Sequence, residues 1–554
     1  MDRNLYDKQT VMVQKKSGFD KSFQNLFTAK VGTIVPILTD ELIPNTTVNL
    51  KAAISAQLPP LASDTFMRCK LKYAAFFVPT RLLMNRYEEW LTDAPTVDGH
   101  GGVRTPIITM PAGATGAERV KYLGPGTLAD YLGYKTTTQT ANALTGAVKI
   151  GALPFLAYHK IYEDWFRNTI IQKSIYTDTT TLDALNASVA RTYAVSRIPF
   201  VAPTYNGVFQ INPLLKTQTE GGSPLYADGV HLMDLRQANF DIDLLTSCTP
   251  QAQNGNAQTV GLNVNEDGKT GQFTISALRA ANSIQQFLER NNIAGNRMVD
   301  YVKANYGANL SDGVAQRALL LGSGAFDMYS KGIFQTASSD VTSPNNPFNS
   351  VAAKYGSAFA DGNDVLVKGF TAMEPGYLMV LCWLSPKVTY STGIDPVLDR
   401  YIEGTSGASQ RTQMANPILQ NVGNEPIQNR IITDKVNSGL MFGFNDRYCT
   451  WKDKIDEVHG LMRDGESLSS FALQRTFTTD NPSINTQFLQ IPTTYLDDVA
   501  AVQDSISQYG YWADTYFDYK VSMPLARYSV PSLQNPAEEH GDAVTINKGG
   551  THLS

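Results

Sequence analysis

The chain has 554 residues, of which 42% are hydrophobic, and this is enough to bury a substantial core. Only 18% are charged, fewer than the roughly 25% of an average soluble domain, which indicates that subunit interfaces cover much of the surface. The formal net charge of −5 excludes a generally basic nucleic-acid coat and leaves room for local basic patches.

The N-terminal residues and the cysteines indicate the compartment in which the protein folds. The first residues are charged and predict no signal peptide, and no apolar run approaches the roughly 20 residues of a membrane span. The cysteines form no CxxC pair and have no zinc-ligand spacing. We expect buried, reduced thiols in a reducing compartment such as the cytosol for all four: Cys69, Cys248, Cys382 and Cys449.

Residues 1–30 are polar and carry basic side chains between aromatic ones such as Phe19, Phe23 and Phe27. One interpretation is a poorly ordered terminus. The other is an N-terminal arm that packs along a partner subunit or contacts nucleic acid. On that second interpretation the candidate contact residues are Arg3, Lys8, Lys15, Lys16 and Lys21.

The first strands are predicted directly after this arm. Residues 31–38 and 46–54 have strand patterns, and Pro44–Asn45 forms a turn between them. In residues 66–78, polar and apolar residues alternate at first, which predicts a strand with one wet face. The polar positions are Arg68, Lys70 and Lys72.

The second half of this strand has a different pattern. Tyr73 to Val78 is a continuous apolar run, which predicts burial on both faces of the sheet. Pro79 cannot donate to a sheet ladder and should end the strand. Residues 79–90 then show helical spacing.

Helical signals occupy the middle of the chain. Residues 93–150 are loop-like apart from a short helix over 127–133. Residues 154–167 form the clearest helix, because Pro154 suits a first turn and apolar residues follow at helical spacing. His159 falls outside that stripe, so we expect an ordinary surface or interface histidine.

Two more helices are predicted over about 276–291 and 297–306, the second ending at Gly307. Loop-rich stretches flank this pair, over 200–273 before it and over 307–365 after it. The apolar face of the first helix consists of Leu278, Ile284, Phe287 and Leu288.

Strand signals return near the C-terminal end, and residues 531–554 form a polar C-terminal extension. The strand segments are 377–384, 440–444, 487–491 and 516–521. Because strands occur along the whole chain, one antiparallel core with insertions fits better than a string of domains. We predict a mainly β fold over residues 31–530, an eight-stranded antiparallel jelly-roll sandwich with long helix- and loop-containing insertions between strands.

No motif predicts catalysis. Gly268-Lys-Thr270 lacks the earlier glycine of a phosphate-binding loop, and residues 263–268 lack the first and twelfth ligands of a calcium loop. The six histidines are scattered, and adjacent carboxylates such as Asp497 and Asp498 would point apart on a helix. We therefore predict no enzyme activity, no catalytic or metal-binding residues and no cofactor.

Aromatic residues beside Lys or Arg can stack on single-stranded bases, although most aromatic residues pack in cores and interfaces. The best candidates for such contact are the arm and the strand segment that carries Arg68, Lys70 and Lys72.

Short segments spread over most of the chain stand in one fixed order. They begin with Ser17-Gly-Phe-Asp and Tyr73-Ala-Ala-Phe-Phe-Val-Pro-Thr-Arg-Leu and end with Tyr528-Ser-Val-Pro-Ser-Leu. Between them lie residues 128–133, 153–168, 278–290, 444–448, 488–492 and 516–524. Together the segments resemble the major capsid protein of the Microviridae, small icosahedral phages with single-stranded DNA, and most closely the gokushovirus-like branch.

The resemblance implies one eight-stranded jelly roll, sixty copies in the simplest icosahedral shell, and single-stranded DNA inside. Implied partners are other copies in pentamers and the shell, a DNA pilot protein, a scaffolding protein and a host surface receptor. The implied location is the virion, after assembly in the bacterial host cytoplasm. No catalytic residues carry over.

Gokushovirus-like coats also carry a long insertion that builds a protrusion at the threefold axes. The favoured candidate here is a loop within 200–273, and the second is 307–365. Thr246-Ser-Cys-Thr-Pro250 resembles a family landmark, so part of 200–273 belongs to the core. The alternative to a coat protein is a host-attachment, spike-like binding module, and an enzyme is a third hypothesis.

Overall fold

The computed structural model describes most of the chain, and the statements below concern the described residues. These are 8–14, 16–63, 65–83, 87, 91, 105–175, 210–211, 228–256, 275–335, 354–399, 424–428, 431–432, 441–475, 477, 482–525 and 541–547.

Nine strands form one hydrogen-bonded sheet. Eight of them follow one path in the order β2-β15-β5-β11-β10-β6-β12-β4, and β3 pairs with β15 off this path. Every pair on this path is antiparallel. The strands are β2 (Ser17–Asp20), β3 (Phe23–Ala29), β4 (Val35–Leu42), β5 (Thr46–Gln57), β6 (Cys69–Pro79), β10 (Leu319–Gln335), β11 (Lys354–Ala372), β12 (Gly376–Pro386) and β15 (Tyr511–Met523).

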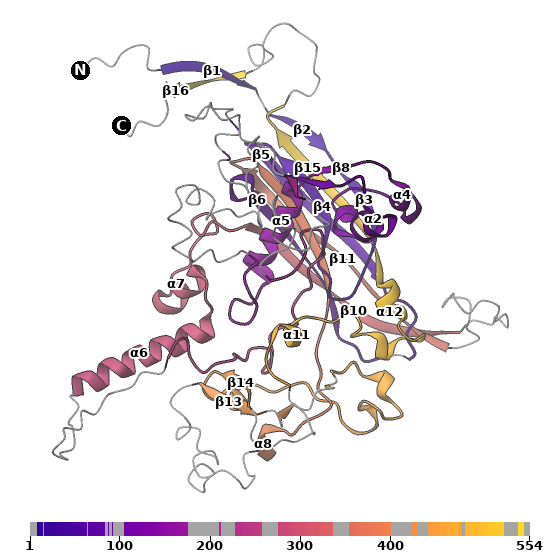
Figure 1. The fold of residues 1–554 in the computed structure, drawn as a ribbon, viewed down its shortest axis with the longest axis vertical. Helices are drawn as coiled ribbons and strands as arrows, with labels where there is room; N and C mark the ends of the chain where they lie inside the picture. The colour runs from indigo at the N-terminus through magenta and orange to yellow at the C-terminus, as the bar shows by residue number, and fades with distance from the viewer. Residues whose placement is uncertain are drawn as a thin grey trace.

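The path folds over so that its two halves face each other as a β-sandwich (Figure 1). We call β2, β3, β15, β5 and β11 sheet I, and β10, β6, β12 and β4 sheet II. The Tyr519 hydroxyl of β15 donates to the Asp40 carboxylate of β4 at 2.7 Å, although these strands lie far apart on the path. The predicted mainly β, antiparallel fold is confirmed.

β6 is buried on both faces, as its apolar run predicts. Phe77 points toward sheet I, where its ring centroid lies 5.2 Å from that of Phe370 on β11. Phe76 points the other way, and its centroid lies 5.9 Å from Trp165 and 6.3 Å from Phe166. Sheet II is therefore the middle layer of three.

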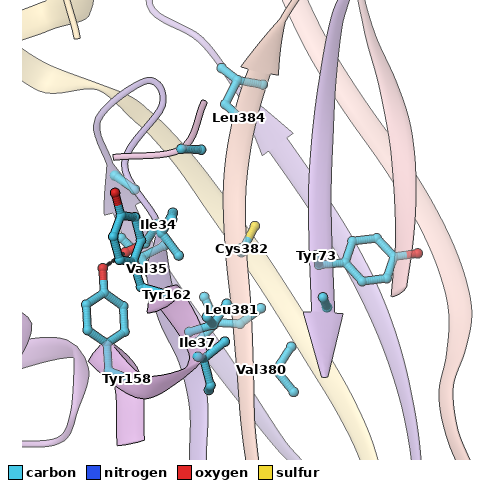
Figure 2. Packing of buried hydrophobic residues seen from close by; sticks show 14 of the residues in the cluster. Ile34, Val35, Ile37, Tyr73, Tyr158, Tyr162, Val380, Leu381, Cys382 and Leu384 are labelled. Atoms are coloured by element: carbon cyan, nitrogen blue, oxygen red, sulfur yellow. Dashed lines mark hydrogen bonds between the residues drawn. The ribbon is translucent and has the colours of Figure 1, made fainter. Parts of the chain in front are cut away.

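The outer layer over sheet II is α5 (Leu153–Ile161), which continues as the π-turn η3 (Tyr162–Phe166). Figure 2 shows Tyr158 of α5 beside Ile34. The strand β12, which carries Cys382, lies between this pair and Tyr73. The Tyr158 hydroxyl donates to the Ile34 carbonyl at 2.8 Å.

The prediction for His159 is wrong, because α5 is covered on every side rather than along one stripe. The ring is fully buried, and its Nε2 lies 2.8 Å from the Leu232 carbonyl oxygen. Leu232 belongs to residues 228–250, whose side chains include buried Phe240, Leu244 and Cys248. This agrees with the assignment of part of 200–273 to the core.

The long strands β10 and β11 join the two sheets. Leu319 to Met328 pair with β6, whereas Tyr329 to Gln335 pair with the start of β11. These strands occupy much of residues 307–365, which the sequence predicted as open and polar, and that prediction is wrong. Their glycines weakened the strand signal.

Residues 105–151 are also more structured than predicted. They contain α2 (Gly116–Leu123), α3 (Leu128–Tyr131) and α4 (Thr138–Ala143), of which only α3 was expected. A separate sheet joins β7 (Ile107–Met110) to β8 (Val148–Gly151) and β9 (Gln210–Ile211).

The two predicted helices after residue 274 are confirmed as α6 (Ile275–Ala294) and α7 (Met298–Tyr306). Gly307 ends α7 with a φ of 67°, the left-handed conformation that favours glycine. The strand predicted over 487–491 is wrong, because Thr486–Leu489 form helix α11. The Asn485 side chain caps this helix by accepting from the Phe488 backbone N–H at 2.8 Å.

The remaining elements are short. β13 (Glu425–Gln428) pairs with β14 (Met441–Asn445). The others are η2 (Thr80–Leu82), α8 (Pro396–Asp399), α10 (Cys449–Lys452), η8 (Gly460–Met462), η9 (Ser469–Phe471), η10 (Asp497–Val499) and α12 (Ser505–Tyr509).

The two ends of the chain meet outside the sandwich. β1 (Lys8–Gln14) pairs with β16 (Gly541–Asn547) as an antiparallel ribbon beyond β2 (Figure 1). Residues 17–29 lie in sheet I as β2 and β3, which differs from the expectation that all of residues 1–30 form an arm. Phe27 is buried there, so this aromatic residue packs the core.

All four cysteines are free and buried, as predicted. Burial raises the pKa of the Cys69 and Cys382 thiols to about 12. Among the described helices, none has both the length and the apolar character that crossing a bilayer requires.

Candidate nucleic-acid and subunit-contact surfaces

Two of the five basic residues predicted in the arm have described side chains. Lys16 is exposed, and its Nζ donates to the Thr47 hydroxyl at 3.2 Å. Lys8 lies in β1, and only its backbone placement is described. Arg3 and Lys15 lie outside the described residues.

Lys21 is engaged within its own chain. Its Nζ pairs with the Asp40 carboxylate and lies 5.5 Å from the centre of the Tyr519 ring. The same carboxylate accepts from the Tyr519 hydroxyl, and burial together with Asp40 raises the pKa of Tyr519. Lys21 thus links the β2–β3 turn to both sheets, and a nucleic acid would have to compete with Asp40 for its charge.

The three basic residues at the start of β6 differ from one another. Arg68 and Lys70 are exposed, and Lys70 stands opposite Asp327 of β10. Lys72 is mostly buried, and its Nζ pairs with the Asp241 carboxylate. Of this group, Arg68 and Lys70 have the exposure that a phosphate contact needs.

Lys21 and the β6 residues do not form one patch. Asp40, the partner of Lys21, stands opposite Leu378, which stands opposite Phe77 of β6. Phe77 is seven residues from Lys70, and a strand rises about 3.3 Å per residue. Lys21 and Lys70 are therefore separated by about 20 Å along the sheet.

The predicted apolar face of α6 is the main surprise on the surface. Leu278, Ile284 and Phe287, three of the four residues of the predicted apolar face, are 47%, 46% and 41% exposed. Periodicity shows that one face is apolar, but it does not show whether the same chain covers that face.

The buried charges near α5 serve the fold. Lys160 pairs with Asp164 at 2.7 Å, and the second Asp164 oxygen accepts from the Ala318 backbone N–H at 2.8 Å. Arg167 pairs with Glu163 at 2.7 Å. These ion pairs fix the π-turn against the start of β10, and each charge has a partner.

The same part of the chain holds a buried polar cluster. Arg236 Nε donates to His159 Nδ1 at 2.9 Å, and Arg236 also pairs with Asp228. Within the described ranges, no group of three or more His, Cys, Asp or Glu side chains is arranged to hold a metal ion.

Comparison with known proteins points to one family. A family model described as "Capsid protein (F protein)" matches residues 8–533. The capsid protein VP1 of Bdellovibrio phage phiMH2K is 26% identical over 541 residues, which cover 93% of this chain and 95% of that protein.

Two further relatives have the same description. Capsid protein VP1 of Chlamydia phage 1 is 25% identical, with 96% of this chain and 98% of that protein covered. Capsid protein VP1 of Spiroplasma virus 4 is 24% identical, with 91% of this chain and 93% of that protein covered. These matches confirm the resemblance to phage coat proteins, and the chain belongs to the capsid protein (F protein) family.

Proposed function

We propose that this structural, non-enzymatic capsid protein is the major coat subunit of a small phage with single-stranded DNA. In this proposal sixty copies close an icosahedral shell around the genome. The main support for this proposal is the strand order of the sandwich, found in a chain that belongs to this capsid family. Closed symmetry lets many modest interfaces build a stable shell.

The strand order supports an eight-stranded jelly roll. Four strands of sheet I run β3-β15-β5-β11, and sheet II runs β10-β6-β12-β4. In chain order, successive strands alternate between the sheets except for β6 and β10, which are neighbours in sheet II. Two such four-stranded sheets built from interleaved strands are the architecture of a jelly roll.

The domain division follows from this architecture. We assign residues 31–530 to the jelly-roll domain, to which β2 and β3 of sheet I also belong, with the residues before Ser17 as an arm and residues 531–554 as a C-terminal extension. The pairing of β1 with β16 supports an origin of both extensions at one end of the domain. The protruding loop is assigned within 200–273, where 200–209, 212–227 and 257–273 lie outside the described residues. The second candidate remains 307–365.

The partners of the coat follow from the same proposal. Single-stranded DNA lies on the inner face and contacts exposed cations such as Lys16, Arg68 and Lys70. A DNA pilot protein and a scaffolding protein join the particle in the bacterial cytoplasm. The threefold protrusion meets the host receptor.

The test is expression of the full chain in a bacterial host, followed by sedimentation and electron microscopy. We expect closed particles with icosahedral symmetry, or pentamers that close when the minor virion proteins are supplied. A stable monomer that binds a glycan or a receptor would instead favour the host-attachment module. Turnover of a substrate that one carboxylate or histidine substitution abolishes would contradict the non-enzymatic assignment.

A further inference from the structure

α6 extends beyond the part of the chain that holds it. Its 20 residues span about 30 Å, whereas the nine residues of α7 span about 14 Å. The C-terminal half of α6 is anchored, because Asn292 donates to the Thr249 hydroxyl at 3.0 Å and Asn305 of α7 donates to Asn291 at 2.8 Å.

The other half, residues 275–284, is exposed at every position except Ala281, which is half-buried. We call it the projecting half of α6. It carries Ile275, Leu278 and Ile284, and Arg279 is its single charged residue. Most helices owe their stability to packing of an apolar face, and no described residue covers the apolar side chains of this segment.

A second exposed apolar surface lies at the start of β6. Phe66, Leu461 and Leu468 are 75%, 58% and 38% exposed. The Leu468 N–H donates to the Leu461 carbonyl at 2.9 Å. The Phe66 N–H donates to the carbonyl of Phe471, which is three residues after Leu468, also at 2.9 Å. The three side chains therefore belong to one region of the surface.

This second surface is acidic at its border. Asp464 and Glu466 are exposed, and no ion pair holds either within the described residues. Burial raises the pKa of nearby Asp498, and the charges of Asp464 and Asp497 add to the effect. Arg463 is the neighbouring cation, and its Nε donates to the Val458 carbonyl at 3.2 Å. We call Phe66, Leu461, Asp464, Glu466 and Leu468 the acidic loop surface.

The two surfaces lie on opposite sides of the molecule. In Figure 1, α6 is at the lower left, whereas α12 lies on the right. α12 contacts η10, and η10 contacts η9, the turn that follows Leu468. A single chain therefore cannot bring its own α6 onto its own acidic loop surface.

We propose that the projecting half of α6 docks on the acidic loop surface of a second copy of this chain. Apolar side chains then meet apolar side chains, and Arg279 faces Asp464 and Glu466. Since the surfaces differ, the contact is head-to-tail, and repeated contacts of this kind close into a ring when the rotation permits. The inference rests on the proposed function, for which it supplies one subunit interface.

A charge exchange tests this docking. Two variants reverse the charge on one side of the contact: the single substitution Arg279→Glu and the double substitution Asp464→Lys/Glu466→Lys. Each variant should lower the yield of closed particles about tenfold, because the shell repeats the contact in every copy. The chain that carries all three substitutions should recover most of the yield, because opposite charges again face each other. Yields are measured by sedimentation and electron microscopy of the full chain.

Arg290→Glu is the matched control, because it reverses the same charge on the anchored half of α6 and should leave the yield unchanged. Thermal unfolding of soluble subunits verifies that each variant folds. Docking is overturned if the single reversals assemble normally, if the combination recovers nothing, or if Arg290→Glu lowers the yield equally. Reversals that form shells but lose a minor virion protein would assign α6 to that protein instead. A wild-type chain that forms no particles would overturn the proposed function as well.

Discussion

His159 is held as a neutral imidazole by contacts on both ring nitrogens. The Leu232 carbonyl can only accept, so Nε2 carries the hydrogen, and Nδ1 accepts from Arg236 Nε at 2.9 Å. Burial, followed by the charge of Arg236, holds the pKa of His159 well below its usual 6.5. A second proton on the ring would face the guanidinium of Arg236.

This arrangement predicts a pH dependence of stability. The unfolded chain binds a proton at His159 as the pH falls below 6.5, whereas the folded chain does not, so the free energy of unfolding decreases on acidification. We expect His159 to account for a loss of up to about 2 kcal/mol between pH 7 and pH 5, the limit reached when the folded chain binds no proton there in this range. Urea unfolding of soluble subunits at several pH values measures this loss.

The comparison variant is His159→Gln, whose amide can donate to Leu232 and accept from Arg236 without titrating. Its unfolding free energy should depend less on pH by that amount. Identical pH profiles for the two proteins would refute a neutral, buried His159.

The burial of single residues was predicted correctly for the cysteines and wrongly for His159. Cys382 sits in a continuous apolar run that leaves no wet face, and Cys69 stands on the apolar side of an alternating strand, so the burial of both was predicted correctly. His159 was misplaced, because a stripe of apolar residues was taken as evidence for an exposed opposite face. Residues 228–250 cover that face, and the sequence pattern of α5 itself does not predict this cover.

At the level of elements, β10 and β11 depend on glycine for close packing. A Cβ built on Gly362 of β11 would lie 2.1 Å from a ring carbon of Phe326 on β10. A Cβ on Gly322 would lie 2.0 Å from the Leu366 carbonyl oxygen. The glycines that hid these strands from sequence analysis are the residues that let the strands approach.

Gly362→Ala should therefore destabilise the fold by about 1–3 kcal/mol, since the added methyl group displaces the Phe326 ring. Gly18→Ala in β2 is the control, because nothing lies within 4 Å of its Cβ position and its φ is not positive. Thermal unfolding of both variants measures the difference. Equal stability of the two variants would show that the ring moves aside freely.

β6 was predicted well, because alternation followed by a fully apolar run reports directly on which faces are covered. The segment 487–491 was not, because a run as short as Phe488-Leu-Gln-Ile has no period long enough to separate a strand from a single helical turn. The helix cap that Asn485 supplies was the local signal available there.

For the whole molecule, the ion pairs decide which of the cations proposed to contact DNA are exposed. Lys21 and Lys72 have carboxylate partners in the same chain, whereas Arg68 and Lys70 are exposed beside the end of sheet II. The sequence identifies all four as cations, Lys21 in the predicted arm and the other three in a predicted strand. It cannot identify their partners, because Asp241 is 169 residues away from Lys72.

We expect Arg68→Gln and Lys70→Gln to weaken binding of purified subunits to single-stranded DNA. Each lost phosphate contact should lower the slope of log K against log salt concentration by about 0.7. Titration of a labelled oligothymidine at four salt concentrations gives the slope. Lys452→Gln is the matched control, because its ammonium pairs with Asp446. An unchanged slope for the β6 variants would remove Arg68 and Lys70 from the DNA-binding surface.

The position of β15 in the sheet has a consequence for biosynthesis. This strand lies between β5 and the β2–β3 pair, yet it is encoded after residue 510 of a 554-residue chain. A ribosome must therefore complete almost the entire polypeptide before sheet I can close. Chains that end before β15 lack a central strand of sheet I, so we expect that they cannot be incorporated into a shell.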